Sequence, residues 1–207
     1  DSFFGIARKV LRVMVCGTGT VGGALLEQIR KQQPLLAERE GLELRVVGIM
    51  SSKHALVNKE GICLDAWQQE LQAAPQLVLQ EAASVAGASV FVDCTASAEV
   101  ASQYADLLKA GISIVGANKA AASGEEAEAL KLLAQENGVK FLYETNAGAG
   151  LPIIGTIRDM IRTGDTVLKI EAVLSGTLNF VCNRLAEGCS YSAAVLEAKA
   201  KGYSEPD

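Results

Sequence analysis

Three glycines near the start of the chain have the spacing of a dinucleotide-binding loop. Gly17, Gly19 and Gly22 form Gly-x-Gly-x-x-Gly directly after an apolar run and directly before residues at helical spacing. The first glycine of such a loop permits a tight turn, the second lets the backbone approach a pyrophosphate, and the third lets helix and strand pack closely. Phosphates then lie at the helix N-terminus, where free N–H groups and the helix dipole favour anions. The pattern predicts a dinucleotide site, and an ordinary glycine-rich turn is the alternative.

Residues that distinguish NADP from NAD are expected at the end of the next strand. The apolar segment 44–50 predicts that strand, and Ser52 and Lys53 follow it. An acidic residue here would bind the ribose 2′-hydroxyl of NAD, whereas hydroxyls and a cation suit the 2′-phosphate of NADP. The sequence therefore favours NADP over NAD. Lys53 is also compatible with an ordinary solvated surface charge.

Further polar side chains follow two other predicted strands. Thr95, Ala96 and Ser97 come after one of them, and Asn118 and Lys119 come after the next. In a doubly wound sheet both loops open at the carboxyl edge, where ligands bind. Lys119 is thereby placed beside the nicotinamide, where its ammonium could donate to a substrate oxygen or relay its proton. Position alone leaves a surface role for this lysine equally open.

The elements that must position these residues alternate between strand and helix. This order predicts βαβ units and an α/β fold with a doubly wound, mostly parallel sheet of the Rossmann type. The segment 55–88 is less clear, with a helix expected over 65–72 and a loop over 85–88. Strands are predicted over 10–15, 44–50, 90–94, 112–115 and 140–143, and helices over 24–33, 99–108 and 124–136.

The character of the sequence changes after residue 145, where a loop of small residues begins. We expect a linker at 1–9, a dinucleotide-binding domain at 10–145, and part of a second domain at 146–207. The second domain has too few elements to close a sheet alone. It is predicted to contain a helix over 151–161, a strand over 167–174, and helices over 178–186 and 192–201, the last stopped by Gly202.

The overall composition excludes several classes of protein. With 19 Lys plus Arg, 24 Asp plus Glu and a net charge of −5, the 207-residue chain lacks the basic face of nucleic-acid-binding proteins. It has no apolar run of the roughly 18 residues that a membrane span needs. Its five cysteines are odd in number and form no Cys-x-x-Cys pair, so we expect buried free thiols in a reducing, cytoplasmic compartment.

The two ends and the single histidine support three further expectations. The start lacks the basic and apolar regions of a signal peptide. The chain begins at Asp1 and stops within the polar Glu205-Pro206-Asp207, so we expect a fragment of a longer protein. His54 lies in a polar stretch, where a solvated or ligand-edge side chain is expected rather than the base of a catalytic triad.

Six segments, spread over nearly the whole chain and in the same order, match one enzyme family. The chain resembles homoserine dehydrogenase, in particular the dehydrogenase part of the bifunctional aspartokinase–homoserine dehydrogenases, and residues 1–10 resemble the linker after the kinase. The motifs NAGAGLP and GYSEPD are far more specific than the glycine pattern. The segments are 17–28 (GTGTVGGALLEQ), 92–97 (VDCTAS), 117–119 (ANK), 144–153 (ETNAGAGLPI), 174–178 (LSGTL) and 201–207 (KGYSEPD).

The resemblance implies an NAD(P)-dependent enzyme that interconverts L-homoserine and L-aspartate 4-semialdehyde, on the route to threonine, methionine and isoleucine. Residues 146–207 would then be part of an α+β substrate and dimerisation domain. The full-length protein would be a homo-oligomer, joined covalently to an upstream aspartokinase.

The resemblance also implies roles for individual residues. Lys119 and Glu205 would be catalytic, with Glu205 holding the homoserine ammonium. A monovalent cation such as sodium would be held by Glu144 with the carbonyls of Ala147, Ala149 and Leu151, although that loop is also compatible with a plain helix N-terminus. The cofactor would contact Gly17, Thr18, Gly19, Thr20, Val21, Gly22, Thr95 and Lys119, and the substrate would contact Gly176, Thr177, Tyr203 and Glu205.

One departure from the family limits the expected activity. The family pattern continues past Asp207 into a stretch with a second lysine, usually taken as the proton donor to the reacting oxygen. The fragment is therefore expected to bind cofactor and to lack full catalysis. A non-catalytic dinucleotide-binding module and another Rossmann dehydrogenase remain the alternatives. An aspartate-semialdehyde dehydrogenase would need an acylating cysteine beside a histidine, and His54 has no such context.

Overall fold

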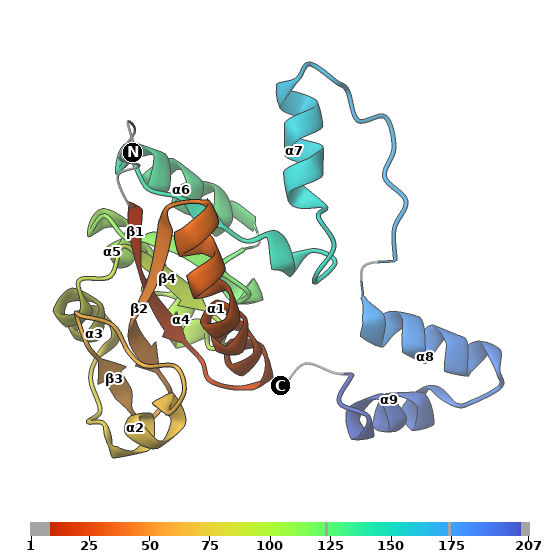
Figure 1. Cartoon of the computed structure of the whole chain (residues 1–207). Coiled ribbons are helices and arrows are strands. Elements are labelled where there is room, and N and C mark those ends of the chain that lie inside the picture. The colour runs from red at the N-terminus through yellow and green to blue at the C-terminus, as the bar shows by residue number, and fades with distance from the viewer. Residues whose placement is uncertain (1–8, 123, 174, 204–207) are drawn as a thin grey trace. The chain divides into compact units, whose positions relative to one another are not determined.

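A computed structural model describes residues 9–122, 124–173 and 175–203 (Figure 1). The chain divides between Asn146 and Ala147 into two compact units. The first unit contains a six-stranded sheet in the order β3-β2-β1-β4-β5-β6. Five strands are parallel, and β3 is antiparallel to β2. The strands are β1 (Lys9–Cys16), β2 (Leu42–Met50), β3 (Ala55–Val57), β4 (Val90–Asp93), β5 (Ser113–Gly116) and β6 (Phe141–Leu142).

The strand order reverses between β1 and β4. From β1 the chain adds β2 on one side, then returns and adds β4, β5 and β6 on the other. Ligands of doubly wound folds bind outside the carboxyl ends of the strands at this reversal, because the connecting loops separate there. The loops after Cys16 and Asp93, which are register partners in adjacent strands, therefore flank the natural ligand crevice.

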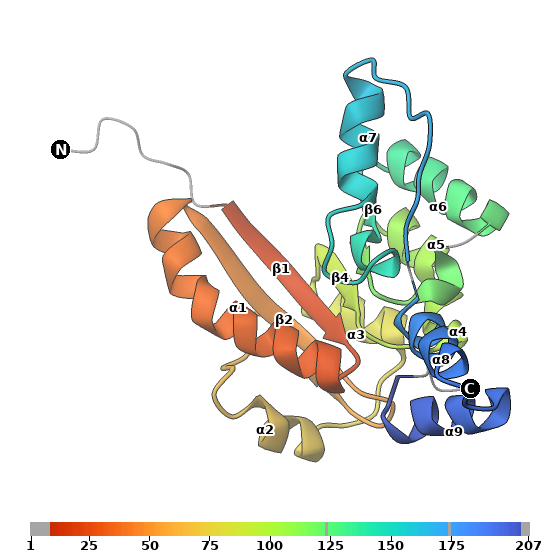
Figure 2. The same cartoon turned by 90° about the vertical axis from the view of Figure 1, so that its right-hand side faces the viewer.

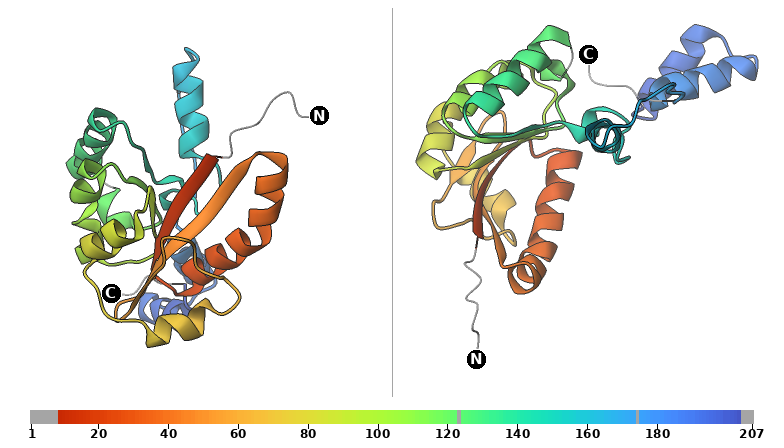
Figure 3. Two further views of the ribbon diagram at one scale, coloured as in Figure 1. Left: turned by 60° about the vertical axis from the view of Figure 1, so that its left-hand side comes forward. Right: turned by 90° about the horizontal axis from the view of Figure 1, so that it is seen from above.

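Helices cover both faces of this sheet, as the view from above in Figure 3 shows. Alternate residues of β1 face opposite ways: Val13 and Val15 pack with α1 and α2, while Met14 joins the core on the other face. Figure 2 shows α1 lying along β1 and β2. Burial of each such aliphatic side chain contributes about 1.5–3 kcal/mol. The helices are α1 (Thr20–Arg39), α2 (Trp67–Ala73), α3 (Leu79–Ala86), α4 (Ala98–Ala101), α5 (Tyr104–Lys109) and α6 (Gly124–Glu136), with the 3-10 turns η1 (Lys119–Ala121) and η2 (Glu144–Asn146).

The second unit contains α7 (Ile154–Arg162), α8 (Gly176–Ala186) and α9 (Tyr191–Ala200). Helices α8 and α9 form a hairpin around Val181, Ala194 and Ala198. Ser175 and Ser190 cap the two helices by accepting hydrogen bonds from backbone N–H groups of the first turns. Such caps stabilise a helix by about 1 kcal/mol.

Most predicted elements are confirmed, and the α/β class with a doubly wound parallel sheet is correct. The single helix expected over 99–108 is wrong, because α4 and α5 are separate helices. The loop expected over 85–88 is also wrong in part, since α3 extends to Ala86 and ends at Gly87, whose φ of +59° suits glycine. Strand β3 and helix α3 were not predicted.

The strand expected over 167–174 is absent from residues 167–173, and residue 174 lies outside the described part of the chain. Leu168 is 93% exposed and Ile170 is 61% exposed. The alternating apolar pattern is present, but a strand forms only against a partner, and none lies beside these described residues. Within the described residues, no helix has the length and apolar character that crossing a membrane requires.

Candidate functional site

The glycine loop is built so that two of its glycines cannot carry a side chain. Gly17 follows β1 with φ +92°, and its N–H donates to the carbonyl of Met50. A Cβ on Gly17 would lie 2.9 Å from the backbone of Cys94, and a Cβ on Gly22 would lie 1.8 Å from the carbonyl oxygen of Gly17. The loop therefore passes close to the end of β4 and to the first turn of α1, as the glycine spacing predicts.

Gly19 differs from the other two because a Cβ there would meet nothing within 4 Å. It is the N-cap of α1 and provides no side-chain cap, and the first turn of α1 contains no acidic residue. The first N–H groups of a helix lack intrahelical acceptors, so this end offers donors and positive dipole charge. An open backbone beside uncapped donors fits the pyrophosphate of a dinucleotide.

The turn after β2 leaves Ser52 and Lys53 exposed. Ser51 organises this turn, since its hydroxyl accepts hydrogen bonds from the N–H groups of Lys53 at 3.3 Å and His54 at 3.1 Å. The His54 ring is fixed by a 2.8 Å hydrogen bond between Nδ1 and the carbonyl of Ala74. The exposed pair is compatible with an anionic group at the end of β2, and His54 has a structural role in the turn.

A buried polar network joins the loops after β4 and β5. The carboxylate of Asp93 is fully buried and accepts hydrogen bonds from the Thr95 N–H at 2.7 Å, the Tyr104 hydroxyl at 2.8 Å and Asn118 Nδ2 at 3.0 Å. Asn118, 2% exposed, also donates to the carbonyl of Ser97 at 2.8 Å. Its Oδ1 accepts from the N–H of Ala120 at 3.0 Å and so caps η1.

This network fixes the backbone around Lys119, the exposed first residue of η1. Asn118 was predicted as a cofactor contact, but its side-chain hydrogen bonds run to other parts of the protein. The sequence interpretation missed Asp93 as a residue of this network, and Tyr104, which donates to it from α5 outside both loops. A buried acid at the end of a strand, directly before polar loop residues, was the available signal for Asp93.

Burial and the Asp93 carboxylate keep two neighbouring thiols and a neighbouring phenol protonated. Desolvation, with a further contribution from Asp93, raises the pKa of Cys16 to about 12 and that of Cys94 to about 11. The same two causes raise the pKa of Tyr104 well above its usual value. All five cysteines are free, as predicted, but the expectation that they are buried is wrong for Cys63 and Cys182, which are exposed. Their raised pKa values make Cys16 and Cys94 neutral thiols near neutral pH, so neither is an activated nucleophile.

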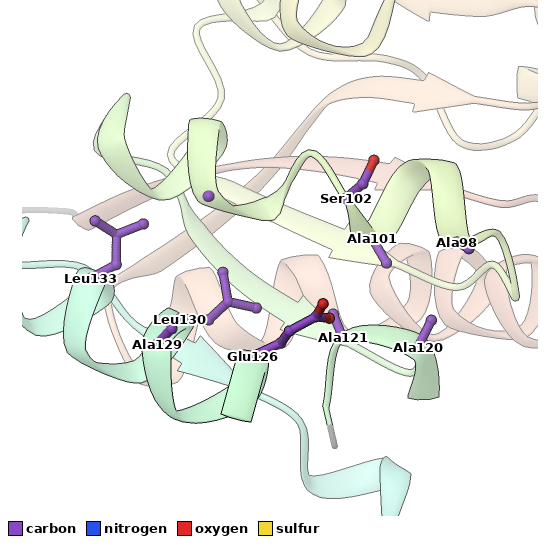
Figure 4. A pocket seen from close by; sticks show the side chains of 10 residues that line it. Ala98, Ala101, Ser102, Ala120, Ala121, Glu126, Ala129, Leu130 and Leu133 are labelled. Carbon is purple, nitrogen blue, oxygen red and sulfur yellow. The ribbon is translucent and has the colours of Figure 1, made fainter. Parts of the chain in front are cut away.

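A cavity of about 520 Å³ lies between α4, α5, η1 and α6 (Figure 4). Its lining is mostly methyl groups, with the Glu126 carboxylate as the main charge. None of its lining residues belongs to the glycine loop, whereas Ala98 directly follows Ser97 and Ala120 directly follows Lys119. The lining residues are Ala98, Ala101, Ser102, Ala105, Ala120, Ala121, Glu126, Ala129, Leu130 and Leu133.

In the second unit, the start of α8 meets the residues after α9. Thr177 donates from its hydroxyl to the carbonyl of Tyr203, and the rings of Phe180 and Tyr203 meet edge to face at 5.1 Å. Gly176 opens α8 beside them. Three of the four predicted substrate residues are thus brought together, and Glu205 lies outside the described residues.

The loop predicted to hold a cation has an unusual backbone. Gly148 and Ala149 both have positive φ, +75° and +51°, and the latter is rare for a residue with a side chain. Asn146 Oδ1 is buried and has no hydrogen-bond partner. Within the described residues, no group of three or more His, Cys, Asp or Glu side chains could hold a metal. The predicted cation ligands, the Glu144 carboxylate with the carbonyls of Ala147, Ala149 and Leu151, include one carboxylate only and so are not a cluster of that kind.

Comparison with known proteins decides the family. Residues 17–144 match the NAD binding domain of homoserine dehydrogenase, and residues 152–207 match the family model described as homoserine dehydrogenase. The chain belongs to the homoserine dehydrogenase family. The predicted resemblance is therefore confirmed.

Bifunctional enzymes are among its relatives. The chain is 40% identical over 215 residues to bifunctional aspartokinase/homoserine dehydrogenase 1, chloroplastic, of Arabidopsis thaliana, covering 100% of this chain and 24% of that protein. It is 38% identical over 209 residues to the bifunctional aspartokinase/homoserine dehydrogenase of Haemophilus influenzae, covering 97% of this chain and 25% of that protein. The chain therefore spans about a quarter of the length of these relatives.

A solved structure supports the same fold. A hyperthermophilic archaeal homoserine dehydrogenase in complex with NADPH matches with a TM-score of 0.82 and 27% identity, covering 96% of this chain and 63% of that one. That protein binds NADPH at its own site, and its fold agrees with the doubly wound sheet described above.

Proposed function

We propose that this chain is the nucleotide-binding part, with a portion of the substrate-binding part, of an NADP-dependent homoserine dehydrogenase. The supporting observation is the open backbone of Gly19 at the uncapped start of α1, placed at the reversal of strand order. That arrangement accepts a pyrophosphate and leaves the loops after β4 and β5 to receive the nicotinamide. Family membership supports L-homoserine and L-aspartate 4-semialdehyde as the substrate pair.

The chain's own residues would orient the reactants and stabilise charge. A bound nicotinamide nucleotide supplies or accepts the hydride. Thr18, Thr20 and Val21, with the glycines, would line the pyrophosphate, and Thr95, Ala96 and Ser97 would line the nicotinamide ribose. The ammonium of Lys119, an exposed residue, would stabilise the developing alkoxide, and the proton would come from the second lysine that the family pattern places past Asp207.

The amino-acid part of the substrate would be held by residues of the second unit. Gly176, Thr177 and Tyr203, which cluster at the start of α8, would contact its polar groups, and Glu205 would hold its ammonium. We further propose a monovalent cation held by Glu144 with the carbonyls of Ala147, Ala149 and Leu151. The left-handed backbone at 148–149 and the unpartnered Oδ1 of Asn146 support an oxygen-lined loop.

The choice of NADP depends on the turn after β2. Ser52 and Lys53 are both exposed there, and a cation beside a 2′-phosphate contributes a favourable charge interaction. We expect Lys53→Asp to weaken NADPH binding about tenfold or more and to leave NADH binding within about twofold. Fluorescence titration with both nucleotides measures this. Equal changes for the two would show that Lys53 does not contact the 2′-phosphate.

The biological setting follows from the relatives and the thiols. Because the relatives are fusions with aspartokinase, we propose that this chain is fused to an aspartokinase domain. We also propose that the full-length protein is a homo-oligomer, as the family resemblance implies. All five cysteines are free, which supports a reducing, cytoplasmic compartment.

The competing function is a dinucleotide-binding module without catalysis. The proton-donating lysine expected past Asp207 would decide between the two. The test titrates the chain with NADPH and then adds aspartate semialdehyde while following the absorbance of the reduced nicotinamide. The same assay is run on the full-length protein, which would carry the second lysine, because this chain alone is expected to bind NADPH without full turnover. Binding with turnover in the full-length protein supports the dehydrogenase, binding without turnover supports the module, and no binding contradicts both.

A further inference from the structure

The loops that follow β4 and β5 share one anchor, the buried pair Asp93 and Asn118. Asp93 ends β4 with its carboxylate fully buried, and Asn118 lies two residues past β5 with 2% of its surface exposed. Their side chains are joined by a 3.0 Å hydrogen bond between Asn118 Nδ2 and Asp93 Oδ2. The three donors to the carboxylate, a backbone N–H, a phenol and an amide, are all neutral.

Each member of the pair also holds a backbone group of a loop. Asp93 holds the loop after β4 through the Thr95 N–H. Asn118 holds that same loop through the carbonyl of Ser97, and its own loop through the Ala120 N–H. The side-chain amide of Asn118 therefore links the two loops by hydrogen bonds and sets their spacing. Removing the donors to a buried carboxylate strongly destabilises the folded protein. The two loops therefore have few alternative conformations of similar energy.

We propose that Asp93 and Asn118 are positioning residues that set the spacing of the β4 and β5 loops and so pre-organise the nicotinamide half of the cofactor site. The inference rests on the proposed function, because it assumes that a nicotinamide nucleotide binds at this edge. The adenosine half would lie over the glycine loop and the end of β2, which make no hydrogen bond to Asn118. Loss of the pair should therefore affect one half of the ligand and spare the other.

The test compares two ligands that differ in the nicotinamide half. NADPH contains both halves, whereas adenosine 2′,5′-bisphosphate contains only the adenosine end with its 2′-phosphate. In the full chain, Asn118→Ala should lower the affinity for NADPH about tenfold. Without the amide, part of the binding free energy would be used to order the two loops. Binding of the bisphosphate should stay within about twofold. Calorimetric titration measures both affinities.

Tyr104→Phe is the matched control. It removes one donor from the same carboxylate, at 2.8 Å, but Tyr104 lies in α5 and holds neither loop. We expect both variants to lower the melting temperature, and Tyr104→Phe to leave the ratio of the two affinities unchanged. A merely structural role of Asn118 would lower stability without changing that ratio.

Three results would overturn the inference. Asn118→Ala could lower the affinities for both ligands equally, or it could lower neither. Alternatively, Tyr104→Phe could change the ratio of the two affinities as much as Asn118→Ala does. Should Asn118→Ala not fold, Asp93→Asn carries the same test, because it keeps the side-chain shape and loses one acceptor. If the unaltered chain binds neither ligand, the proposed function fails as well. If the unaltered chain binds both ligands and Asn118→Ala changes neither affinity, only the present inference fails.

Discussion

Substitution of two glycines by alanine should separate the stability of the loop from its ability to bind phosphate. Gly22 and Gly19 lie three residues apart at the start of α1, yet their surroundings are opposite. A Cβ on Gly22 would lie 1.8 Å from the carbonyl oxygen of Gly17, and a Cβ on Gly19 would meet nothing within 4 Å. Gly22→Ala should therefore disturb folding and binding, whereas Gly19→Ala should disturb binding alone.

The expected loss for Gly22→Ala follows from two opposing terms. Alanine gains up to about 1 kcal/mol over glycine as a helix former. Against this, overpacking costs about 1–3 kcal/mol or more, and the upper end applies because the clashing group of Gly17 is backbone that no rotamer change can move. The net loss is about 2 kcal/mol, which lowers the melting temperature by about 4–8 °C in a chain of this size.

For Gly19→Ala the folded chain changes little. Its φ of −73° suits alanine, and reduced freedom of the unfolded chain offsets the poorer N-cap, so stability should stay within about 1 kcal/mol. The new methyl group would instead occupy the space where a pyrophosphate approaches, and NADPH affinity should fall by about tenfold or more.

Thermal unfolding and fluorescence titration with NADPH test both variants side by side. Full NADPH affinity in Gly19→Ala would refute a pyrophosphate beside that backbone. Unchanged melting of Gly22→Ala would show that α1 does not start against Gly17 as described.

Three further predictions concern other parts of the chain. In a full-length protein with measurable turnover, Lys119→Ala should lower kcat strongly while the protein still folds, and unchanged turnover would remove Lys119 from the mechanism. At pH 8, iodoacetamide should modify the exposed Cys182 and spare Cys94, whose pKa is raised to about 11, as peptide mass spectrometry can show. The hydrogen bond from Lys201 lowers the pKa of Glu197. The ionised Glu197 should therefore stabilise the fold above about pH 4.3, the ordinary pKa of glutamate, and this stabilisation should be lost as the pH falls through the lowered pKa. Urea unfolding of wild type and Glu197→Gln at several pH values checks this.

The sequence predicts the glycine half of the crevice well because its requirements are local. Gly17 and Gly22 are needed for a turn and a close contact within seven residues of β1, and the flanking strand and helix follow from short-range periodicity. Helix α1 continues to Arg39, beyond the predicted end at residue 33, even though Pro34 lies inside it. The α1 side chains in the core, Leu25, Leu26 and Ile29, all precede Pro34, so packing on the sheet accounts for the start of the helix and not for its last turns.

The other half of the crevice could not be predicted in the same way. Tyr104 and Asn118 reach Asp93 from 11 and 25 residues further along the chain, and no local pattern distinguishes them from surface polar residues. The exposed segment 167–173 shows the converse case. Its alternating apolar residues predict a strand, but strand formation requires a partner that the local sequence does not specify.

The two halves therefore differ in how they can change. Ser52 and Lys53, which we propose set specificity for the adenosine end, are exposed on a turn that Ser51 organises, so their side chains can be exchanged at little cost in stability. The nicotinamide end depends on Asp93 and Asn118, which are buried and hydrogen-bonded on several sides, so a substitution there alters the loops and the core together. The proposal therefore predicts that single substitutions at Ser52 or Lys53 suffice to change the preference between NADP and NAD, whereas a change in the geometry beside Lys119 requires several coupled substitutions.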